Sequence, residues 1–340
     1  MSKLLLTLDG GGIRGAAATH FLMRLDQALE ARHGRALRDC VDFYAGTSTG
    51  SIIALALGTT RLPLEALNDL YGVASAQAIF AENRGWFEID GMNAPRYAAE
   101  GKASVLRREF GDARLRDVPT GKHVLAVAYA VEQRKPVVLK STAPRHRELL
   151  SWQVADGSSA APTYFPTRPL TWDGAEQWLV DGGVIANNPT LCAVAEVRRA
   201  WPGYGLEDVR VLSVGTGYRT RKIDGPASRK WGALGWVTQG HLVDLLADEQ
   251  VVAYQARNLL PAGAYIRVNS ELARQPGLPE APADDMDDVS ESNIRRLKAL
   301  GDFWFEAYGE AALALLLDRY EGPSLDRIDA ATGRPREVLA

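Results

Sequence analysis

The stretch LLLTLDGGGIRG, residues 4–15, decides the fold class of this chain. Its apolar first half predicts a buried strand, and Asp9 followed by three glycines predicts a tight loop where that strand ends. From Ala16 to about Ala31 the apolar residues recur at helical spacing, and His33-Gly34 predicts the end of the helix. The order is therefore strand, glycine loop, helix.

The same order recurs further along the chain. An apolar pattern from Cys40 to Tyr44 runs into Gly46-Thr47-Ser48-Thr49-Gly50, and the apolar stretch Ile52–Leu57 predicts the next helix. Further strands are predicted over His123–Val131, Val137–Lys140, Trp178–Val180 and Val209–Val214. Strands that alternate with helical patterns predict the α/β class, here a three-layer α/β/α sandwich with a mostly parallel central sheet.

Composition and length favour one globular domain. The chain has 340 residues, of which 46% are hydrophobic and 24% charged, which is an ordinary globular composition with enough apolar residues for a large core. We expect a single domain over 1–340, with a motif-bearing core at about 4–217 and a C-terminal helical segment at about 289–320, broken near Gly301 or Gly309. The loop from 275 to 288 and an irregular insertion at 219–236 lie between them.

The charge balance and the N-terminus bear on partners and location. A net charge of −3 gives no general attraction to nucleic acid polymers or anionic lipid, so any peripheral membrane contact must be local. The N-terminal residues do not fit a signal peptide, and no apolar stretch approaches the ~20 residues of a transmembrane helix. We expect a cytoplasmic protein that makes peripheral contact with the membrane surface.

The pentapeptide Gly46-Thr47-Ser48-Thr49-Gly50 matches the pattern Gly-x-Ser-x-Gly. A serine at a sharp turn from strand to helix is exposed at the strand's carboxyl end, and the flanking glycines let the backbone close. The following helix adds the positive end of its dipole. Taken alone, the pentapeptide fits equally well a plain glycine-rich turn in which Ser48 caps the helix.

The glycine loop offers consecutive backbone amides with little side-chain obstruction. Such amides can bind the oxyanion of acyl transfer, each well-placed donor lowering the barrier by roughly 3 kcal/mol. Gly10, Gly12 and Gly15 also satisfy the dinucleotide-binding fingerprint Gly-x-Gly-x-x-Gly, so a nucleotide-binding α/β protein is an alternative. That fingerprint requires an acid about 20 residues on, at a strand end, and Glu30 falls instead on the polar end of a helix. We favour oxyanion binding.

A third loop, Asp181-Gly182-Gly183, closes the strand Trp178–Val180, and Asn187-Asn188-Pro189 follows as a helix start. An acid at this position can face Ser48. Taken alone, the motif fits better an aspartate that caps its own turn, which is common in Asp-Gly sequences.

Together the three loops resemble the patatin-like phospholipase family, in particular bacterial members that act as serine acyl hydrolases. The family pattern is an Asp-Gly-Gly-Gly-x-Arg-Gly loop, a Gly-x-Ser-x-Gly turn and a later Asp-Gly-Gly or Asp-Gly-Ala, and this chain holds all three in order. The similarity spans roughly Leu4 to Gly217 and includes Ser158–Phe165 and Gly215-Thr216-Gly217.

The resemblance implies a serine-aspartate dyad without a histidine, in which Ser48 is the nucleophile and Asp181 the general base. It implies a lipid acyl hydrolase that cleaves carboxylic esters of phospholipids or lysophospholipids through an acyl-enzyme. The implied oxyanion hole is formed by backbone amides, and we assign it to Gly10, Gly11, Gly12 and Arg14, the side chain of Arg14 having no catalytic role. The glycines expected to support the motifs are Gly15, Gly46, Gly50, Gly182 and Gly183.

The alternative mechanism is a triad in the order Ser, acid, His. Of the five histidines, His20, His33, His123 and His146 precede Asp181, which leaves His241. His241 begins a helix-like segment, where a capping or solvated histidine is expected. An aspartate with an ordinary pKa near 3.9 is a weak base, so the dyad needs help from oxyanion donors and from desolvation.

No metal or organic cofactor is implied. A hypothesis from another class is an antiphage defence effector switched on by a cyclic nucleotide, because some short bacterial members of the family work in that way. The acidic run Asp284–Asp288 has Val289 where a calcium loop needs glycine, so we expect a solvated loop. Phe80, Trp86 and Phe87 are expected to border the acyl pocket.

Overall fold

The computed structural model describes residues 2–83, 94–239 and 248–338. The strands are β1 (Lys3–Leu8), β2 (Phe43–Thr47), β3 (His123–Ala130), β4 (Lys135–Lys140), β5 (Arg168–Trp172), β6 (Ala175–Asp181), β7 (Val209–Val214), β8 (Tyr265–Val268), β9 (Ser324–Asp329) and β10 (Arg334–Val338). The longer helices are α1 (Gly15–His33), α3 (Thr49–Thr59), α6 (Ala99–Phe110), α7 (Ser151–Ser158), α9 (Thr190–Ala200), α13 (Gln250–Leu259) and α14 (Glu291–Leu316). The shorter ones are α2 (Leu37–Cys40), α4 (Leu64–Asp69), α5 (Val73–Ile79), α8 (Gly183–Ala186), α10 (Gly225–Ser228) and α11 (Ala233–Thr238).

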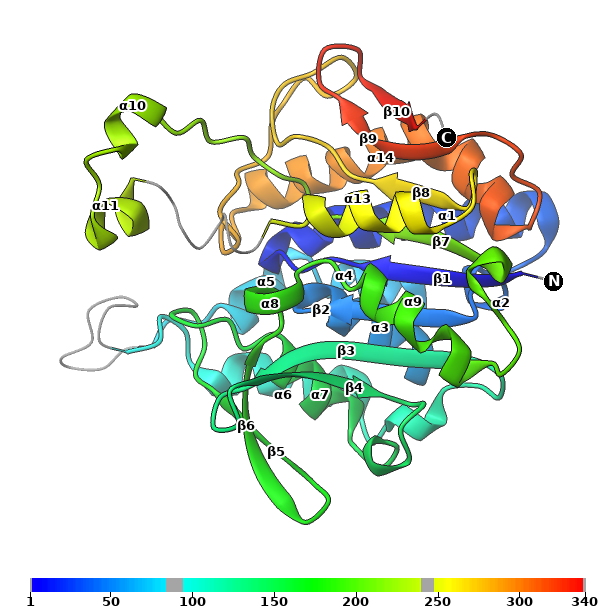
Figure 1. Cartoon of the computed structure of the whole chain (residues 1–340). Coiled ribbons are helices and arrows are strands. Elements are labelled where there is room, and N and C mark those ends of the chain that lie inside the picture. The colour runs from blue at the N-terminus through cyan, green and yellow to red at the C-terminus, as the bar shows by residue number, and fades with distance from the viewer. Residues whose placement is uncertain (1, 84–93, 240–247, 339–340) are drawn as a thin grey trace.

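All ten strands belong to one sheet, in the order β10-β9-β8-β7-β1-β2-β3-β6-β5, with β4 also on β3 (Figure 1). Neighbours from β9 through β3 run parallel, whereas the pairings of β10, β4, β5 and β6 are antiparallel. The prediction of a mostly parallel sheet is confirmed for its centre. The sheet joins strands from before and after residue 217.

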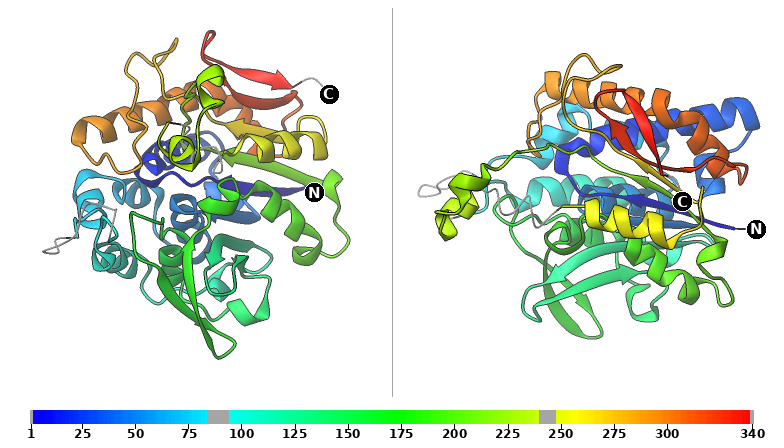
Figure 2. Two further views of the ribbon diagram at one scale, coloured as in Figure 1. Left: turned by 60° about the vertical axis from the view of Figure 1, so that its left-hand side comes forward. Right: turned by 45° about the horizontal axis from the view of Figure 1, so that its top comes forward.

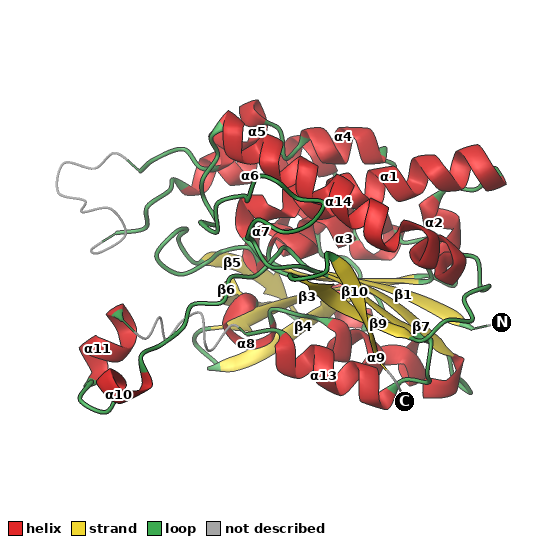
Figure 3. Cartoon of the chain, turned by 90° about the horizontal axis from the view of Figure 1, so that it is seen from above, coloured by secondary structure: helices red, strands yellow, loops and turns green. Residues whose placement is uncertain are grey.

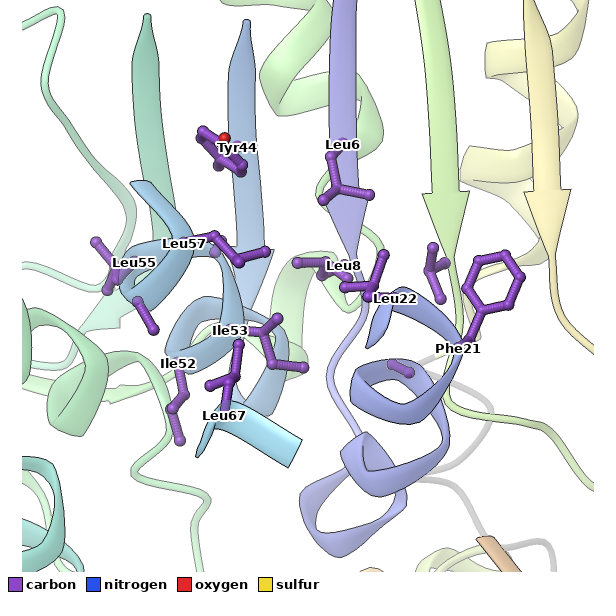
Figure 4. Packing of buried hydrophobic residues seen from close by; sticks show 14 of the residues in the cluster. Leu6, Leu8, Phe21, Leu22, Tyr44, Ile52, Ile53, Leu55, Leu57 and Leu67 are labelled. Atoms are coloured by element: carbon purple, nitrogen blue, oxygen red, sulfur yellow. The ribbon is translucent and has the colours of Figure 1, made fainter. Parts of the chain in front are cut away.

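Helices cover both faces of the sheet, which gives the three layers that the sequence predicts (Figure 3). The larger layer includes α1, α3, α7 and α14, and α9 and α13 lie on the opposite face. Strand β1 supplies both cores by alternation, because Leu4, Leu6 and Leu8 join the cluster under the larger layer while Leu5 joins the other. Figure 4 shows Leu6 and Leu8 packing beside Phe21 and Leu22 of α1.

Strand β2 and helix α14 differ from their sequence predictions, and strands β5, β8, β9 and β10 have no predicted counterpart. Strand β2 begins at Phe43, and Cys40 instead ends the short helix α2. Helix α14 runs unbroken through Gly301 and Gly309. A Cβ atom at Gly301 would lie 2.7 Å from the carbonyl oxygen of Ala17, so this glycine permits close packing of α14 on α1 and does not interrupt the helix.

The insertion predicted at 219–236 carries α10 and the first part of α11, which ends at Thr238. Both helices stand off the body near the end where β1 finishes (Figures 1 and 2). The loop predicted at 275–288 contains no helix or named strand. None of the helices in the described part of the chain is both long and apolar enough to cross a bilayer.

Candidate active site

Ser48 occupies a sharp turn between β2 and α3. Its φ is 54°, a backbone conformation that residues other than glycine rarely adopt. A Cβ atom on Gly46 would lie 2.1 Å from the carbonyl oxygen of Gly50, and one on Gly50 would lie 2.1 Å from that of Leu8. Both flanking glycines are therefore required by close approach. The turn is also held by the Ser48 amide, which donates to Ser158 Oγ at 3.2 Å.

Asp181 reaches Ser48 because two strands meet end to end on β3. Strand β4 pairs with Leu125–Ala130 on one edge of β3, so β2 and β6 share the other edge. On that edge Thr47 pairs with Val127 and Asp181 pairs with the next residue, Ala128. The end of β2 and the end of β6 thus face each other although they come from opposite directions. The sequence predicts the meeting of the loops but not this antiparallel approach.

The side chains of Ser48 and Asp181 are hydrogen-bonded across this junction. Ser48 Oγ donates to Asp181 Oδ2 at 2.5 Å, and the Gly183 amide donates to Asp181 Oδ1 at 2.6 Å. Both carboxylate oxygens are therefore oriented by donors. Gly182 is confined at the same place, since a Cβ atom there would lie 2.3 Å from the carbonyl oxygen of Val127.

Burial raises the pKa of Asp181 to about 6, although the hydrogen bonds from Ser48 and Gly183 and the positive charge of Lys102 oppose the rise. The residue is only 4% exposed, and desolvation penalises its charged form. A carboxyl group with a pKa near 6 is a far better base at neutral pH than one with an ordinary pKa near 3.9.

The glycine loop lies beside Ser48, and its four predicted donors differ in what they bind. The Gly10 amide donates to the Asn187 carbonyl at 3.1 Å, and the Arg14 amide donates to the Gly11 carbonyl at 3.2 Å. Among the described residues, no acceptor is recorded for the amides of Gly11 and Gly12. Of the four predicted donors, Gly11 and Gly12 are therefore the ones whose amides are left to bind an oxyanion, because the amides of Gly10 and Arg14 already donate to carbonyl groups.

Hydrogen bonds, an ion pair and close packing hold the rest of the glycine loop in place. The Arg14 side chain donates from Nε to the Gly11 carbonyl at 3.2 Å, and the hydroxyl of Thr216 donates to the Gly10 carbonyl at 2.7 Å. A Cβ atom on Gly15 would lie 2.5 Å from Thr49 Oγ1, so this glycine lets α1 begin against α3. Asp9 is buried and ion-paired with the equally buried Arg267.

A cavity of about 390 Å³ opens above the two hydrogen-bonded side chains. Gly11, Gly12, Ser48 and Asp181 line it on one side. Its other walls are largely apolar and include Ile52, Leu70, Ile79, Phe80 and Phe165. The expectation that Phe80 borders the pocket is confirmed, whereas Trp86 and Phe87 lie outside the described residues.

The loop at 284–288 corrects the expectation of a solvated acidic run. The Met286 carbonyl accepts from the Ile13 amide at 2.9 Å, and Met286 lines the cavity. Asp287 accepts from Arg96 Nη1 at 2.6 Å and from the hydroxyl of Tyr97 at 2.5 Å. Asp284 forms an ion pair with Arg221 at 2.6 Å. No pattern in the sequence links this segment to a glycine loop some 270 residues earlier.

The alternatives from the sequence find less support in the geometry. His20, His33, His123 and His146, the described histidines, are absent from the cavity walls, and His241 lies outside the described residues. Glu30 lies within α1, away from any strand end, as the sequence analysis expects.

Comparisons with known proteins show what the chain is similar to. A family model described as "Patatin-like phospholipase" matches residues 6–194. "Patatin-like protein 2" of Oryza sativa subsp. indica is 27% identical, over 98% of this chain and 87% of that protein. Human "Calcium-independent phospholipase A2-gamma" is 25% identical, over 86% of this chain and 38% of that protein. The solved structure of human GIVD cytosolic phospholipase A2 aligns with a TM-score of 0.45 at 12% identity, over 94% of this chain and 62% of that one.

Proposed function

The chain belongs to the patatin-like phospholipase family, whose members are lipid hydrolases, and we propose that it cleaves carboxylic esters of phospholipids or lysophospholipids with Ser48 and Asp181. The observation that carries the proposal is the 2.5 Å contact between Ser48 Oγ and Asp181 Oδ2 at the floor of an apolar cavity. Neither nucleotide binding by the Gly10–Gly15 loop nor activation by a cyclic nucleotide is favoured by the comparisons.

In the proposed reaction, Ser48 Oγ attacks the ester carbonyl and transfers its proton to Asp181 Oδ2. The oxyanion accepts hydrogen bonds from the Gly11 and Gly12 amides, and the N-terminus of α3 adds its positive dipole. The alcohol leaves with the proton from Asp181. Water then attacks the acyl-enzyme while Asp181 accepts a proton from it. As the fatty acid is released, Asp181 returns that proton to Ser48 Oγ, which restores the starting state.

The test is product analysis of the wild type and Ser48→Ala with phospholipid and lysophospholipid substrates. We expect the wild type to release fatty acid and to be labelled by a fluorophosphonate probe, and Ser48→Ala to do neither, because the attacking oxygen is missing. Lipid mass spectrometry and mass analysis of the labelled peptide measure both results. Ser292→Ala, a change at an exposed serine of α14, is the matched control. Fatty acid release by a folded Ser48→Ala protein would refute the assignment.

We further propose that the mouth of the cavity contacts the lipid surface through α8. Val184 lines the cavity, and both Val184 and Ile185 are 42% exposed, which is unusual for large apolar side chains beside an opening.

Ile185→Ser is expected to weaken binding to phosphatidylcholine vesicles by about tenfold, since one large aliphatic side chain would no longer enter the lipid. Hydrolysis of a soluble short-chain ester is expected to stay unchanged. Vesicle co-sedimentation and a colorimetric ester assay measure the two effects. Leu206→Ser is the control, because it also replaces an exposed aliphatic side chain with serine. Leu206 lies just before β7, at the opposite end of the sheet. Equal vesicle binding by both variants would contradict the assignment.

A further inference from the structure

Lys102 is a buried cation in the wall of the cavity. It lies on α6 and its side chain is 2% exposed. Its Nζ donates to the carbonyl oxygens of Asp156 at 3.1 Å and Ser159 at 2.8 Å, and to Ser159 Oγ at 3.0 Å. An ammonium group has three protons for these three acceptors, whereas a neutral amine has only two. The three acceptors match the three protons of a charged lysine.

Burying that charge is costly unless it is paired and hydrogen-bonded. The other buried residues of α6 are apolar and include Ala103, Val105 and Leu106, so the helix itself does not need a lysine. Asp156 Oδ1 lies 3.2 Å from Lys102 Nζ, and the Asp156 carboxylate also pairs with Arg168. The Phe165 ring, a cavity wall, lies with its centroid 4.3 Å from the ammonium.

The segment that Lys102 fixes is the one to which both members of the dyad are attached. Asp156–Ala160 forms the end of α7 and the residues after it. Ser158 Oγ accepts from the Ser48 amide at 3.2 Å, and the Ala160 carbonyl accepts from the Asp181 amide at 2.9 Å. A movement of this segment would therefore displace the nucleophile and the base relative to each other.

We propose that Lys102 is a positioning residue for the dyad: its ammonium clamps Asp156–Ala160 and supplies the positive charge that acts on the Asp181 carboxylate. This inference rests on the proposed function, because it assigns Lys102 a role in a reaction carried out by Ser48 and Asp181.

The surrounding charges are consistent with this role. The interactions that shift the pKa of Asp181 downward come from Ser48, Gly183 and Lys102, and Lys102 is the charged group among them. Around Lys102 the charged groups of the described residues are Asp156, Asp181 and Arg168. Burial lowers the pKa of Lys102, and the two carboxylates oppose that effect. Without the ammonium of Lys102, the effect of burial on Asp181 is opposed less strongly, so the pKa of Asp181 rises.

The test is the pH profile of kcat/KM on a soluble ester for Lys102→Met and Lys102→Gln. In the wild type, activity is expected to rise with pH through about 6, as Asp181 loses its proton. In both variants that acid limb should move up by about one unit, because an opposite charge that favoured the carboxylate is gone. The plateau kcat should fall by about 10- to 100-fold, because the dyad is less well aligned.

Lys122→Met is the matched control. Lys122 Nζ also donates to backbone carbonyls, at 2.6 Å to that of Arg38 and at 2.5 Å to that of Val41. Lys122 directly precedes β3, however, and so lies at the opposite end of that strand from Asp181. Lys102→Gln keeps two donors for the carbonyls and covers the case in which Lys102→Met does not fold. Lys102→Arg keeps the charge and should keep the wild-type acid limb.

An unmoved acid limb in the folded neutral variants would overturn the proposal, even with a lower plateau, because a purely structural lysine would behave in that way. Such a result would leave the proposed function intact. Failure of that function would be recognised separately, by wild-type activity in Ser48→Ala.

Discussion

Asp181→Asn is expected to slow ester hydrolysis by about 10⁴-fold and, at neutral pH, to make the folded protein more stable. The rate falls because an amide cannot accept the proton of Ser48 Oγ, which lies 2.5 Å from Asp181 Oδ2. The stability rises because burial lifts the pKa of Asp181 to about 6, so its ionisation in the folded chain costs about 3 kcal/mol relative to the unfolded chain. A base made stronger by burial therefore destabilises the protein that contains it.

The pH dependence of the free energy of unfolding tests whether ionisation of Asp181 destabilises the folded chain. Because the folded pKa of Asp181 lies above the unfolded one, the stabilising effect of its protonated form is complete below about pH 4 and is lost as pH rises through about 6. The stability of the wild type relative to Asp181→Asn should therefore fall by about 3 kcal/mol across this range. Urea unfolding of both proteins at acid and neutral pH measures the difference, and fatty acid release measures the rate.

Asp173→Asn makes the same chemical change at a side chain that is 55% exposed, between β5 and β6, and should alter neither property. Undiminished hydrolysis by Asp181→Asn would contradict its role as base. Lost hydrolysis with no gain in stability at neutral pH would contradict the buried charge.

The parts of the fold that the sequence predicts are those with a local pattern. The glycine loop after β1, the turn at Ser48 and the loop after β6 each follow an apolar strand pattern, and each lies where expected. Strand β8 was not predicted, because its four residues include Arg267, whose charge interrupts the apolar run. That arginine is 1% exposed and pairs with Asp9, which directly follows β1 and lies 258 residues earlier in the chain.

The parts of the site that the sequence does not predict depend on long-range geometry. The end-to-end meeting of β2 and β6 requires the register of both strands on β3, which no local pattern encodes. The burial of Lys102 is equally hidden, since a lysine on a helix is normally solvated. Met286 lies among four aspartates and contacts the glycine loop through its backbone carbonyl oxygen. Because every residue has such a carbonyl, the identity of the side chain does not predict this contact.

Gly12→Ala is expected to lower kcat by about 10²- to 10³-fold, the loss that follows removal of an oxyanion donor. Gly12 has a φ of +58°, and a Cβ atom there would lie 2.2 Å from the Met286 carbonyl oxygen. That oxygen accepts the Ile13 amide, so relief of the clash must shift either residue 286 or the loop itself. Either movement turns the Gly11 and Gly12 amides away from the oxyanion. The kcat for a soluble ester, per folded molecule, is the measurement.

Gly34→Ala separates this clash from backbone strain. Gly34 has a φ of +61° at the end of α1, and a Cβ atom there would have no atom within 4 Å. Both alanine variants therefore carry the cost of a left-handed residue, about 1 kcal/mol, which urea unfolding detects. Only Gly12→Ala also disturbs the donors, so Gly34→Ala should keep the wild-type kcat. Equal kcat values for the two folded variants would mean that the Gly11 and Gly12 amides do not stabilise the transition state.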